Sequence, residues 1–278
     1  MKLFDKNEAS AKRLTLLSAI ALGLALLATV GRIVCLSFFY DRIGYFTRGA
    51  LLPIALTLIY TLAIIFFAVA VFCNKYDAPS AKLSKASSLA ALLPAVAFFP
   101  LIVSGINAIL SLPSGVKAPL FDLLYLVLSV AASAYFLSLA FAKQPSSASI
   151  VLGVAYILWA AFAWMGSYLD FYVPMNSPDK LFFHLACIAS MLLVFSEVRA
   201  IYEIPRTKMY YFSFFTAIVC ISTSAIPSLI ASSGDVFASY SLANEDLVFT
   251  AIFIYAAIRL FDKPGQLTET ESKDSDQE

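Results

Sequence analysis

Eight long stretches of almost uninterrupted apolar residues follow one another along the chain. A helix that crosses the hydrocarbon core of a bilayer needs about 20 such residues. The stretches are apolar on every face, whereas strands of a membrane barrel would alternate. Helices satisfy their own backbone groups in lipid, so the pattern predicts an all-α bundle of transmembrane helices. The approximate ranges are 14–38, 50–73, 88–112, 120–142, 148–169, 181–199, 210–231 and 245–261.

The first and last stretches each allow a second interpretation. The apolar run from Leu14 to Gly31 is longer than the core of a cleavable signal peptide, which has about 7–15 residues, so we expect an uncleaved span. The stretch 245–261 would be about 25 Å long as a helix, short of a hydrocarbon core of roughly 30 Å. A seven-span alternative, with the C-terminus outside, therefore stays open beside the eight-span prediction.

Lysine and arginine residues gather in alternate connections between these stretches. With the N-terminus in the cytoplasm, 14 of the 19 basic residues fall in cytoplasmic segments and 4 in the opposite loops, while Arg32 lies inside the first stretch. Cytoplasmic loops of membrane proteins carry such an excess of positive charge. The split predicts an even number of spans, both termini in the cytoplasm, and a location in the plasma membrane.

The composition supports a protein that lies mostly in lipid. Hydrophobic residues make up 61% of the 278 positions and charged residues 13%, about half the charge of a soluble domain. The formal net charge of +1, without a long basic cluster, argues against a nucleic-acid partner. We predict one transmembrane domain over residues 1–262, followed by an acidic, disordered cytoplasmic tail over 263–278.

Several landmarks recur at similar offsets in the two halves of the chain. Asp41 and Asp170 follow tyrosines after the first and fifth stretches, Asp122 and Asp246 open the fourth and eighth, and prolines occur within the third and seventh. Transporter folds often contain internal repeats. The landmarks suggest two four-helix halves in the same orientation, although such residues are also common at membrane boundaries.

Polar and charged side chains within or beside the predicted spans lie at one depth, in the outer third. A charge at the bilayer centre costs at least about 2.5–3.5 kcal/mol, so such residues need partners or water. Arg32 is the strongly basic member, and its expected ion-pair partners are Asp122 and Asp170. Together they predict an outward-facing polar cavity, unless each is simply a polar helix end among the headgroups. The candidate lining residues are Arg32, Asn107, Asp122, Asp170, His184 and Asp246.

Motifs for catalysis and metal binding are missing from the sequence. It contains no GxxxxGK[ST] phosphate loop, no HExxH and no GxSxG. The cysteines at 35, 73, 187 and 220 are far apart in apolar stretches, and His184 is the one histidine. We therefore expect no enzyme activity, no catalytic residue, no metal site and no cofactor, with the cysteines as small buried side chains.

Part of the second half of the chain resembles a group of uncharacterised multi-span bacterial inner-membrane proteins. The resemblance covers residues 168–230 and implies a bacterial inner-membrane location, with no assigned activity and no site. The residues that carry it are Tyr168-Leu169-Asp170, Pro174-Met175-Asn176-Ser177-Pro178-Asp179-Lys180, Ser196-Glu197-Val198-Arg199 and Ile226-Pro227.

Two functions fit these observations, and an intramembrane enzyme is a third, less favoured alternative. The first is a carrier or binder of a small solute, with the polar cavity around Arg32 as its site. The second is a non-catalytic membrane subunit or sensor that binds another membrane protein or a second copy of itself. Ala21, Ala25 and Thr29 share one face of the first stretch and would let another helix approach closely, as the second function requires. The eight spans without a soluble domain favour the carrier, because an anchor needs fewer.

Overall fold

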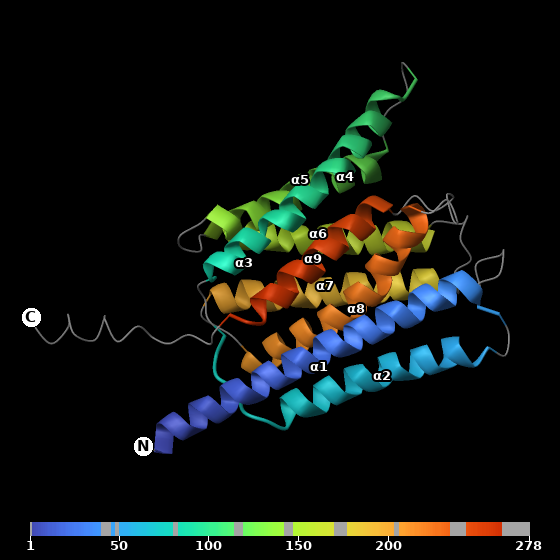
Figure 1. Ribbon diagram of the computed structural model, residues 1–278. Coiled ribbons are helices and arrows are strands. Elements are labelled where there is room, and N and C mark those ends of the chain that lie inside the picture. Colours follow the sequence, from blue (N-terminus) through green and yellow to red (C-terminus); the bar gives the residue numbers. More distant parts are fainter. Residues whose placement is uncertain are drawn as a thin grey trace, which may run out of the picture.

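The computed structural model describes residues 2–39, 46–47, 50–79, 83–113, 119–141, 147–169, 177–202, 206–233 and 243–262. These residues form nine helices, and the predicted all-α bundle is confirmed (Figure 1). The predicted tail, 263–278, lies outside the described residues. The helices are α1 (Lys2–Phe38), α2 (Leu51–Phe72), α3 (Lys85–Ala90), α4 (Leu92–Leu110), α5 (Leu120–Phe141), α6 (Ser147–Leu169), α7 (Pro178–Ile201), α8 (Thr207–Ser233) and α9 (Ala243–Arg259).

Seven helical segments are long and apolar enough to cross a membrane, so the chain has the make-up of an integral membrane protein. One of them, Lys85–Leu110, combines α3 and α4, which are separated by a turn at Ala91. Pro94 follows this turn and lacks the N–H that would bond to the carbonyl of Ala90. The eighth predicted segment is α9, whose 17 residues give a length of about 25 Å.

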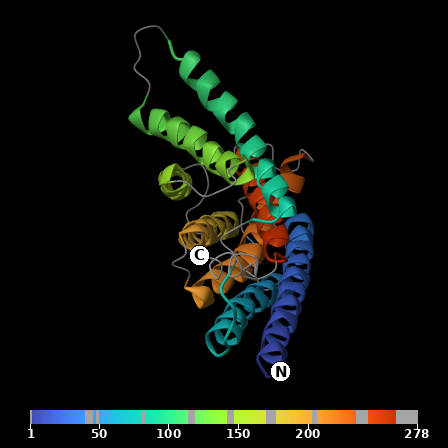
Figure 2. The same ribbon diagram turned by 90° about the vertical axis from the view of Figure 1, so that its left-hand side faces the viewer.

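The helices from α4 to α9 form a closed ring. Each packs against the next along the chain, and α9 closes the ring by packing against α4. Helix α1 lies outside the ring against α8, and α2 packs against both of these (Figures 1 and 2). Because α8 has neighbours on all sides, it is the most deeply buried of the seven long segments. Its small polar residues are accommodated within the protein, away from lipid.

Small side chains allow the close approach of α1 and α8. Ala21, Ala25 and Ala28 are almost completely buried, Thr29 is buried on the same stripe, and α8 is the main neighbour of α1. The prediction that this face receives another helix is therefore confirmed. The helix it receives belongs to the same chain.

Aromatic side chains fill the interior of the ring. Trp159 of α6 lies at the centre, with its ring centroid 4.7 Å from that of Phe98 on α4 and 5.8 Å from that of Phe249 on α9. Tyr156 and Phe136 continue this cluster, with ring centroids 5.5 Å apart. All five side chains are fully buried. The interior of the ring is thus a packed core that also contains polar atoms, namely the hydroxyl and indole groups.

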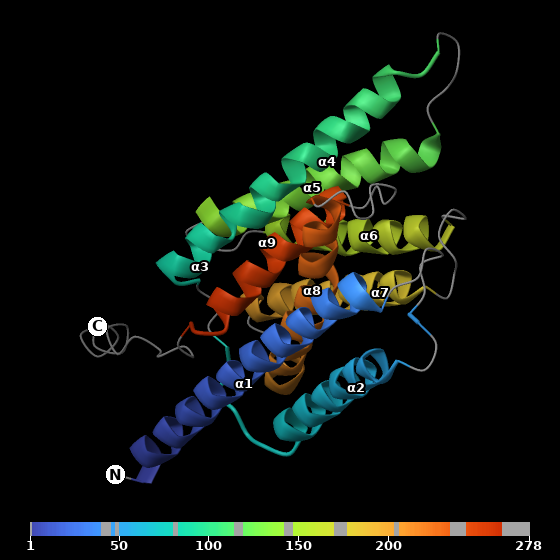
Figure 3. The same cartoon turned by 45° about the vertical axis from the view of Figure 1, so that its right-hand side comes forward.

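Successive long helices run in opposite directions, so α1 begins and α9 ends at the same end of the bundle (Figure 1). We call this the Arg259 end, after the last residue of α9. The opposite end, where α1 ends and α9 begins, is the Arg32 end. At the Arg32 end, α4 and α5 diverge from the other helices (Figures 1 and 3).

The two halves of the chain pack differently. In a four-plus-four repeat, α2 and the α3–α4 segment would correspond to α7 and α8. Helices α7 and α8 pack extensively against each other, whereas α2 and α4 form no such pair among the described residues. Helix α4 packs against α9 instead and closes the ring. The arrangement of the helices therefore gives the predicted repeat no support.

Candidate functional site

Arg32 is buried near the C-terminal end of α1, where it forms an ion pair with Asp179. The two atoms in contact, Arg32 Nη2 and Asp179 Oδ1, are 2.5 Å apart. The ring of Phe182 lies 4.1 Å below the guanidinium carbon, which adds a cation–π contact. The side chain of Arg32 is 1% exposed and that of Asp179 is 21% exposed. The arginine is therefore shielded from solvent, whereas the carboxylate of Asp179 is partly accessible to solvent.

The local sequence explains the position of Asp179. Ser177 caps α7 by accepting a hydrogen bond from the backbone N–H of Lys180, at 3.3 Å, and Pro178 occupies the first turn. This start places Asp179 in the first turn of α7, with Phe182 one turn further along. Because α1 and α7 both pack against α8, these residues can meet Arg32.

The remaining nitrogens of Arg32 are not satisfied. Nε and Nη1 are buried and have no hydrogen-bond partner among the described residues. A buried donor without a partner costs about 1–3 kcal/mol, and more when the group is charged. The N–H groups on these two nitrogens could therefore donate to the acceptor atoms of a ligand.

Two acidic residues at the start of α9 complete the polar environment at this end. Asp246 is buried, and the charges of Arg32 and Asp179 are close enough to act on it. Glu245 accepts a hydrogen bond from the hydroxyl of Tyr125, at 2.9 Å, while its second oxygen is buried without a partner. The Arg32 end therefore combines an incompletely paired cation with acidic groups.

The structure brings Arg32 and Asp246 together, but it does not gather all the predicted residues. His184 is half-buried on α7, and its neighbours are the aromatic rings of Trp164, Tyr168 and Phe183. Its Nε2 atom has no partner in the described part of the chain.

The other predicted residues do not join this group. Asn107 and Asp122 are exposed on α4 and α5, near the ends that diverge from the bundle. The expected pairing of Arg32 with Asp122 was wrong, because that end of α5 lies apart from α1 and Asp179 supplies the partner. Asp170 lies outside the described residues.

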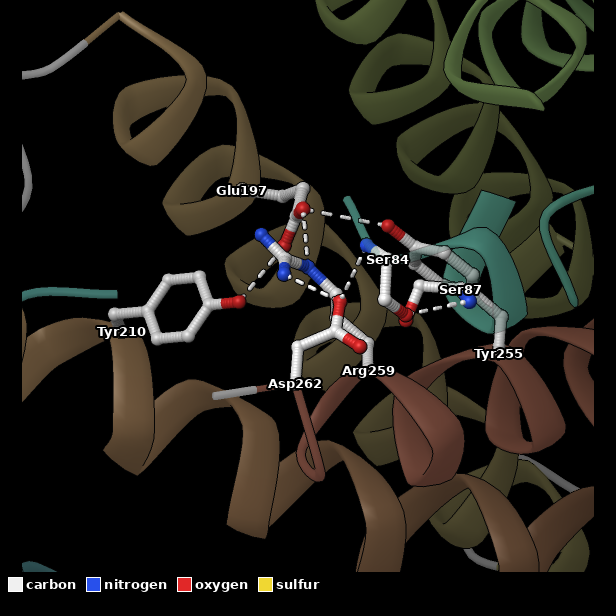
Figure 4. A network of polar contacts seen from close by, with 7 residues as sticks. All are labelled: Ser84, Ser87, Glu197, Tyr210, Tyr255, Arg259 and Asp262. Atoms are coloured by element: carbon white, nitrogen blue, oxygen red, sulfur yellow. Dashed lines mark hydrogen bonds and ion pairs between the residues drawn. The ribbon is translucent and has the colours of Figure 1, made fainter. Parts of the chain in front are cut away.

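A second buried arginine lies at the opposite end of the bundle (Figure 4). Arg259 donates from Nε to Glu197 Oε1, at 3.0 Å, and from Nη1 to Asp262 Oδ2, at 2.7 Å. Glu197 also accepts hydrogen bonds from the hydroxyls of Tyr210, at 3.2 Å, and Tyr255, at 3.3 Å. The side chains of Arg259 and Glu197 are each 1% exposed. This network joins α7, α8 and α9.

Asp262 extends the network to the start of α3. Its Oδ2 atom accepts a hydrogen bond from the backbone N–H of Ser84, at 3.2 Å, and Ser84 in turn caps α3 by accepting from the N–H of Ser87. Burial disfavours the charged form of Asp262. The hydrogen bonds from the two serines and the charge of Arg259 outweigh this effect, so the pKa of Asp262 is lowered.

Three of these charged residues did not stand out in the sequence. None of Asp179, Glu197 and Arg259 is among the candidate lining residues predicted from the sequence. One signal was available, since Glu197 and Arg259 have opposite charges and lie near the ends of the sixth and eighth predicted stretches. Nothing in the sequence showed that α7 and α9 would face each other there, because that contact depends on the closed ring.

No protein-family model, curated protein or solved structure matches this chain. Across the described ranges, no three His, Cys, Asp or Glu side chains come together as the ligands of a metal ion would. The interpretation of the site therefore depends on its own geometry.

Proposed function

We propose that this protein is a membrane carrier that binds a small solute at Arg32. The observation that supports the proposal is that two buried arginines differ in their hydrogen-bond partners. Arg259 donates to two carboxylates, whereas Nε and Nη1 of Arg32 have no partner in the described structure. A buried, incompletely paired charge is expensive in a membrane protein, and such residues mark substrate pathways. A bound solute would supply the missing acceptors.

The charges around Arg32 favour a solute with both a carboxylate and an ammonium group, as in an amino acid. The carboxylate would accept hydrogen bonds from Arg32. The ammonium group would face Asp179, which is the ion-pair partner of Arg32, and the carboxyl group of Asp246. The negative charge of Asp179 disfavours a multiply charged anion such as phosphate. Phe182 forms an apolar wall beside the guanidinium.

We further propose that the Arg32 end faces outward and the Arg259 end faces the cytoplasm of a bacterium, in its plasma membrane. The excess of lysine and arginine in alternate connections supports this orientation. The alternative function, a membrane subunit, lost its main support, because the small face of α1 is already covered by α8.

Thermal unfolding of the purified protein in detergent can test the site. Alanine, acetate and inorganic phosphate serve as probes, each over a range of concentrations. We expect alanine to raise the unfolding temperature, because a ligand at 100 times its Kd stabilises the folded state by about 2.7 kcal/mol. Acetate should act more weakly, and phosphate should have no effect.

The matched variants are Arg32→Gln and Arg206→Gln. Arg206 is exposed at the start of α8 and lies outside the site. The response to alanine should disappear in Arg32→Gln and persist in Arg206→Gln. A response that persists in both variants would overturn the proposed site, as would the failure of alanine and acetate to stabilise the wild type.

A further inference from the structure

Within the described part of the chain, three polar groups inside the six-helix ring have no hydrogen-bond partner by distance and angle. The hydroxyls of Tyr135 and Tyr156 and the indole Nε1 of Trp159 are buried without a hydrogen bond in the described structure. All three side chains are completely buried in the packed core. Buried polar groups are normally satisfied, and where protein groups do not suffice, ordered water takes this role. These groups therefore indicate positions for bound water in the ring.

The three groups form part of a continuous row. The rings of Tyr125 and Trp159 are 6.2 Å apart between centroids, those of Trp159 and Tyr156 are 5.5 Å apart, and those of Tyr156 and Tyr135 are 6.4 Å apart. Tyr125 lies near the start of α5 and Tyr135 near its end. Because α5 runs from the Arg32 end to the Arg259 end (Figure 1), the part of the row between Tyr125 and Tyr135 runs in the same direction.

A carboxylate lies at each end of this row. At the Arg32 end, Tyr125 donates to Glu245, whose second oxygen is buried and unpartnered. The charged and titratable groups around Glu245 also include Asp246 and Cys187. This carboxylate is the only acceptor that the described structure gives the Tyr125 hydroxyl, so it forms the first step of the row.

At the Arg259 end, the row reaches Glu197. The hydroxyl of Tyr135 lies within the electrostatic influence of Glu197, and Tyr255 donates to that carboxylate at 3.3 Å. The other groups that face Glu197 are Arg259 and Tyr210. Asp262 follows on the far side of Arg259 and leads to the edge of the bundle.

From this arrangement we infer that the ring contains a proton path between Glu245 and Glu197. Buried carboxylates in transmembrane segments typically mark proton relays. A tyrosine hydroxyl or a water accepts one proton as it releases another, so each step breaks and forms one O–H bond and one proton moves in total. The indole of Trp159 only donates, and it therefore holds a water in the row.

This inference goes beyond the proposed solute site and does not depend on it. Arg32 is not a member of the row, and the row lies within the six-helix ring, whereas α1 lies outside it. A variant of Arg32 therefore separates the two proposals.

The experiment measures proton flux into liposomes that contain the purified full-length protein and the pH-sensitive dye pyranine. A potassium gradient with valinomycin drives the protons, and no solute is added. The test variants are Tyr156→Phe and Glu245→Gln. Tyr156→Phe removes one buried hydroxyl beside Ser190 and leaves the ring in place, so the fold should be retained, and its unfolding temperature verifies this. The matched control is Tyr60→Phe, because Tyr60 on α2 also has a buried hydroxyl, beside Cys220, but lies outside the ring.

We expect wild-type protein, Tyr60→Phe and Arg32→Gln to conduct protons above the rate of protein-free liposomes. Tyr156→Phe and Glu245→Gln should lose this flux. Two results would overturn the path: wild-type flux equal to that of empty liposomes, or unchanged flux in a folded Tyr156→Phe variant. Loss of alanine binding in Arg32→Gln with normal flux would support both proposals, and failure of alanine binding alone would leave the path standing.

Discussion

The two ends of the bundle each contain a buried arginine, but the two arginines differ in how many of their N–H groups have partners. Arg259 donates to Glu197 and Asp262, and both of these acids are themselves held by further hydrogen bonds. Arg32 forms an ion pair with Asp179, and two of its nitrogens have no hydrogen-bond partner among the described residues. Arg259 therefore links helices at its end of the bundle, whereas Arg32 retains N–H groups that could donate to a ligand.

Packing follows the same division. At the Arg259 end, α3, α7, α8 and α9 converge on one network (Figure 4). At the Arg32 end, α4 and α5 diverge from the remaining helices (Figure 3). An end where the buried arginine donates to two carboxylates and the helices pack tightly suits a closed gate. An end where the buried arginine has N–H groups left over suits a site that a ligand completes. The following substitutions test this comparison.

The largest effect is expected for Arg259→Met. It leaves Glu197 buried without its countercharge, and breaking a buried pair in this way costs about 3–5 kcal/mol. The measurement is the free energy of unfolding in detergent micelles, with exposed Arg206→Met as the control. Equal stability of Arg259→Met and the wild type would mean that the network does not hold the Arg259 end together.

A smaller loss is expected for Gly153→Ala, near the same end. A Cβ atom on Gly153 would come within 2.5 Å of Val198 Cγ2 and 3.2 Å of Tyr135 Cε2. Overpacking of this kind costs about 1–3 kcal/mol. Thermal unfolding should show a clear decrease for Gly153→Ala.

The matched substitutions are Gly105→Ala on α4 and Gly23→Ala on α1. At Gly105 the closest atom is Leu126 Cδ1, at 3.2 Å, with Cβ and Cγ of the same side chain at 3.8 and 3.9 Å, and at Gly23 nothing lies within 4 Å. Both variants should unfold close to the wild type. If Gly105→Ala were as damaging as Gly153→Ala, the two ends would not differ in packing.

Arg32→Met should cost less than Arg259→Met, about 1 kcal/mol. The substitution removes one ion pair, but it also removes two unsatisfied donors, and Asp179 is exposed enough to be hydrated. Unfolding experiments on the two methionine variants under one condition give the comparison. A loss for Arg32→Met as large as that for Arg259→Met would contradict the contrast between the ends.

The smallest effect concerns pH and Asp262. Its pKa is lowered from the ordinary value of 3.8, so the ionised group stabilises the fold above that pH. This contribution is lost as the pH falls through the lowered pKa. The unfolding temperature of the wild type should therefore decrease more steeply below pH 3.8 than that of Asp262→Asn. Parallel curves for the two proteins would show that Asp262 is not held as described.

The helices could be predicted from the sequence because the need for about 20 apolar residues is a local property. The stripe of small residues on α1 was also visible locally, and it was found to face α8. The partner of Arg32 was not predicted, because a pairing across 147 positions depends on which helices share a neighbour. The Glu197 network was missed for a related reason. Glu197 and Arg259 lie near the ends of predicted spans, where charges commonly meet the membrane surface, whereas ring closure buries this pair.

If the Arg32 end opens to a solute from outside while the Arg259 end stays closed, thiols at the two ends should react at different rates. Thr29→Cys and Ser196→Cys place thiols in buried positions beside Arg32 and Glu197, in a background where Cys35, Cys73, Cys187 and Cys220 are alanine. Their rates of reaction with a small, membrane-impermeant thiol reagent are measured in intact cells. We expect Thr29→Cys to react, alanine to slow this reaction, and Ser196→Cys to stay protected. Equal protection of both thiols, or faster labelling of Ser196→Cys, would contradict this expectation.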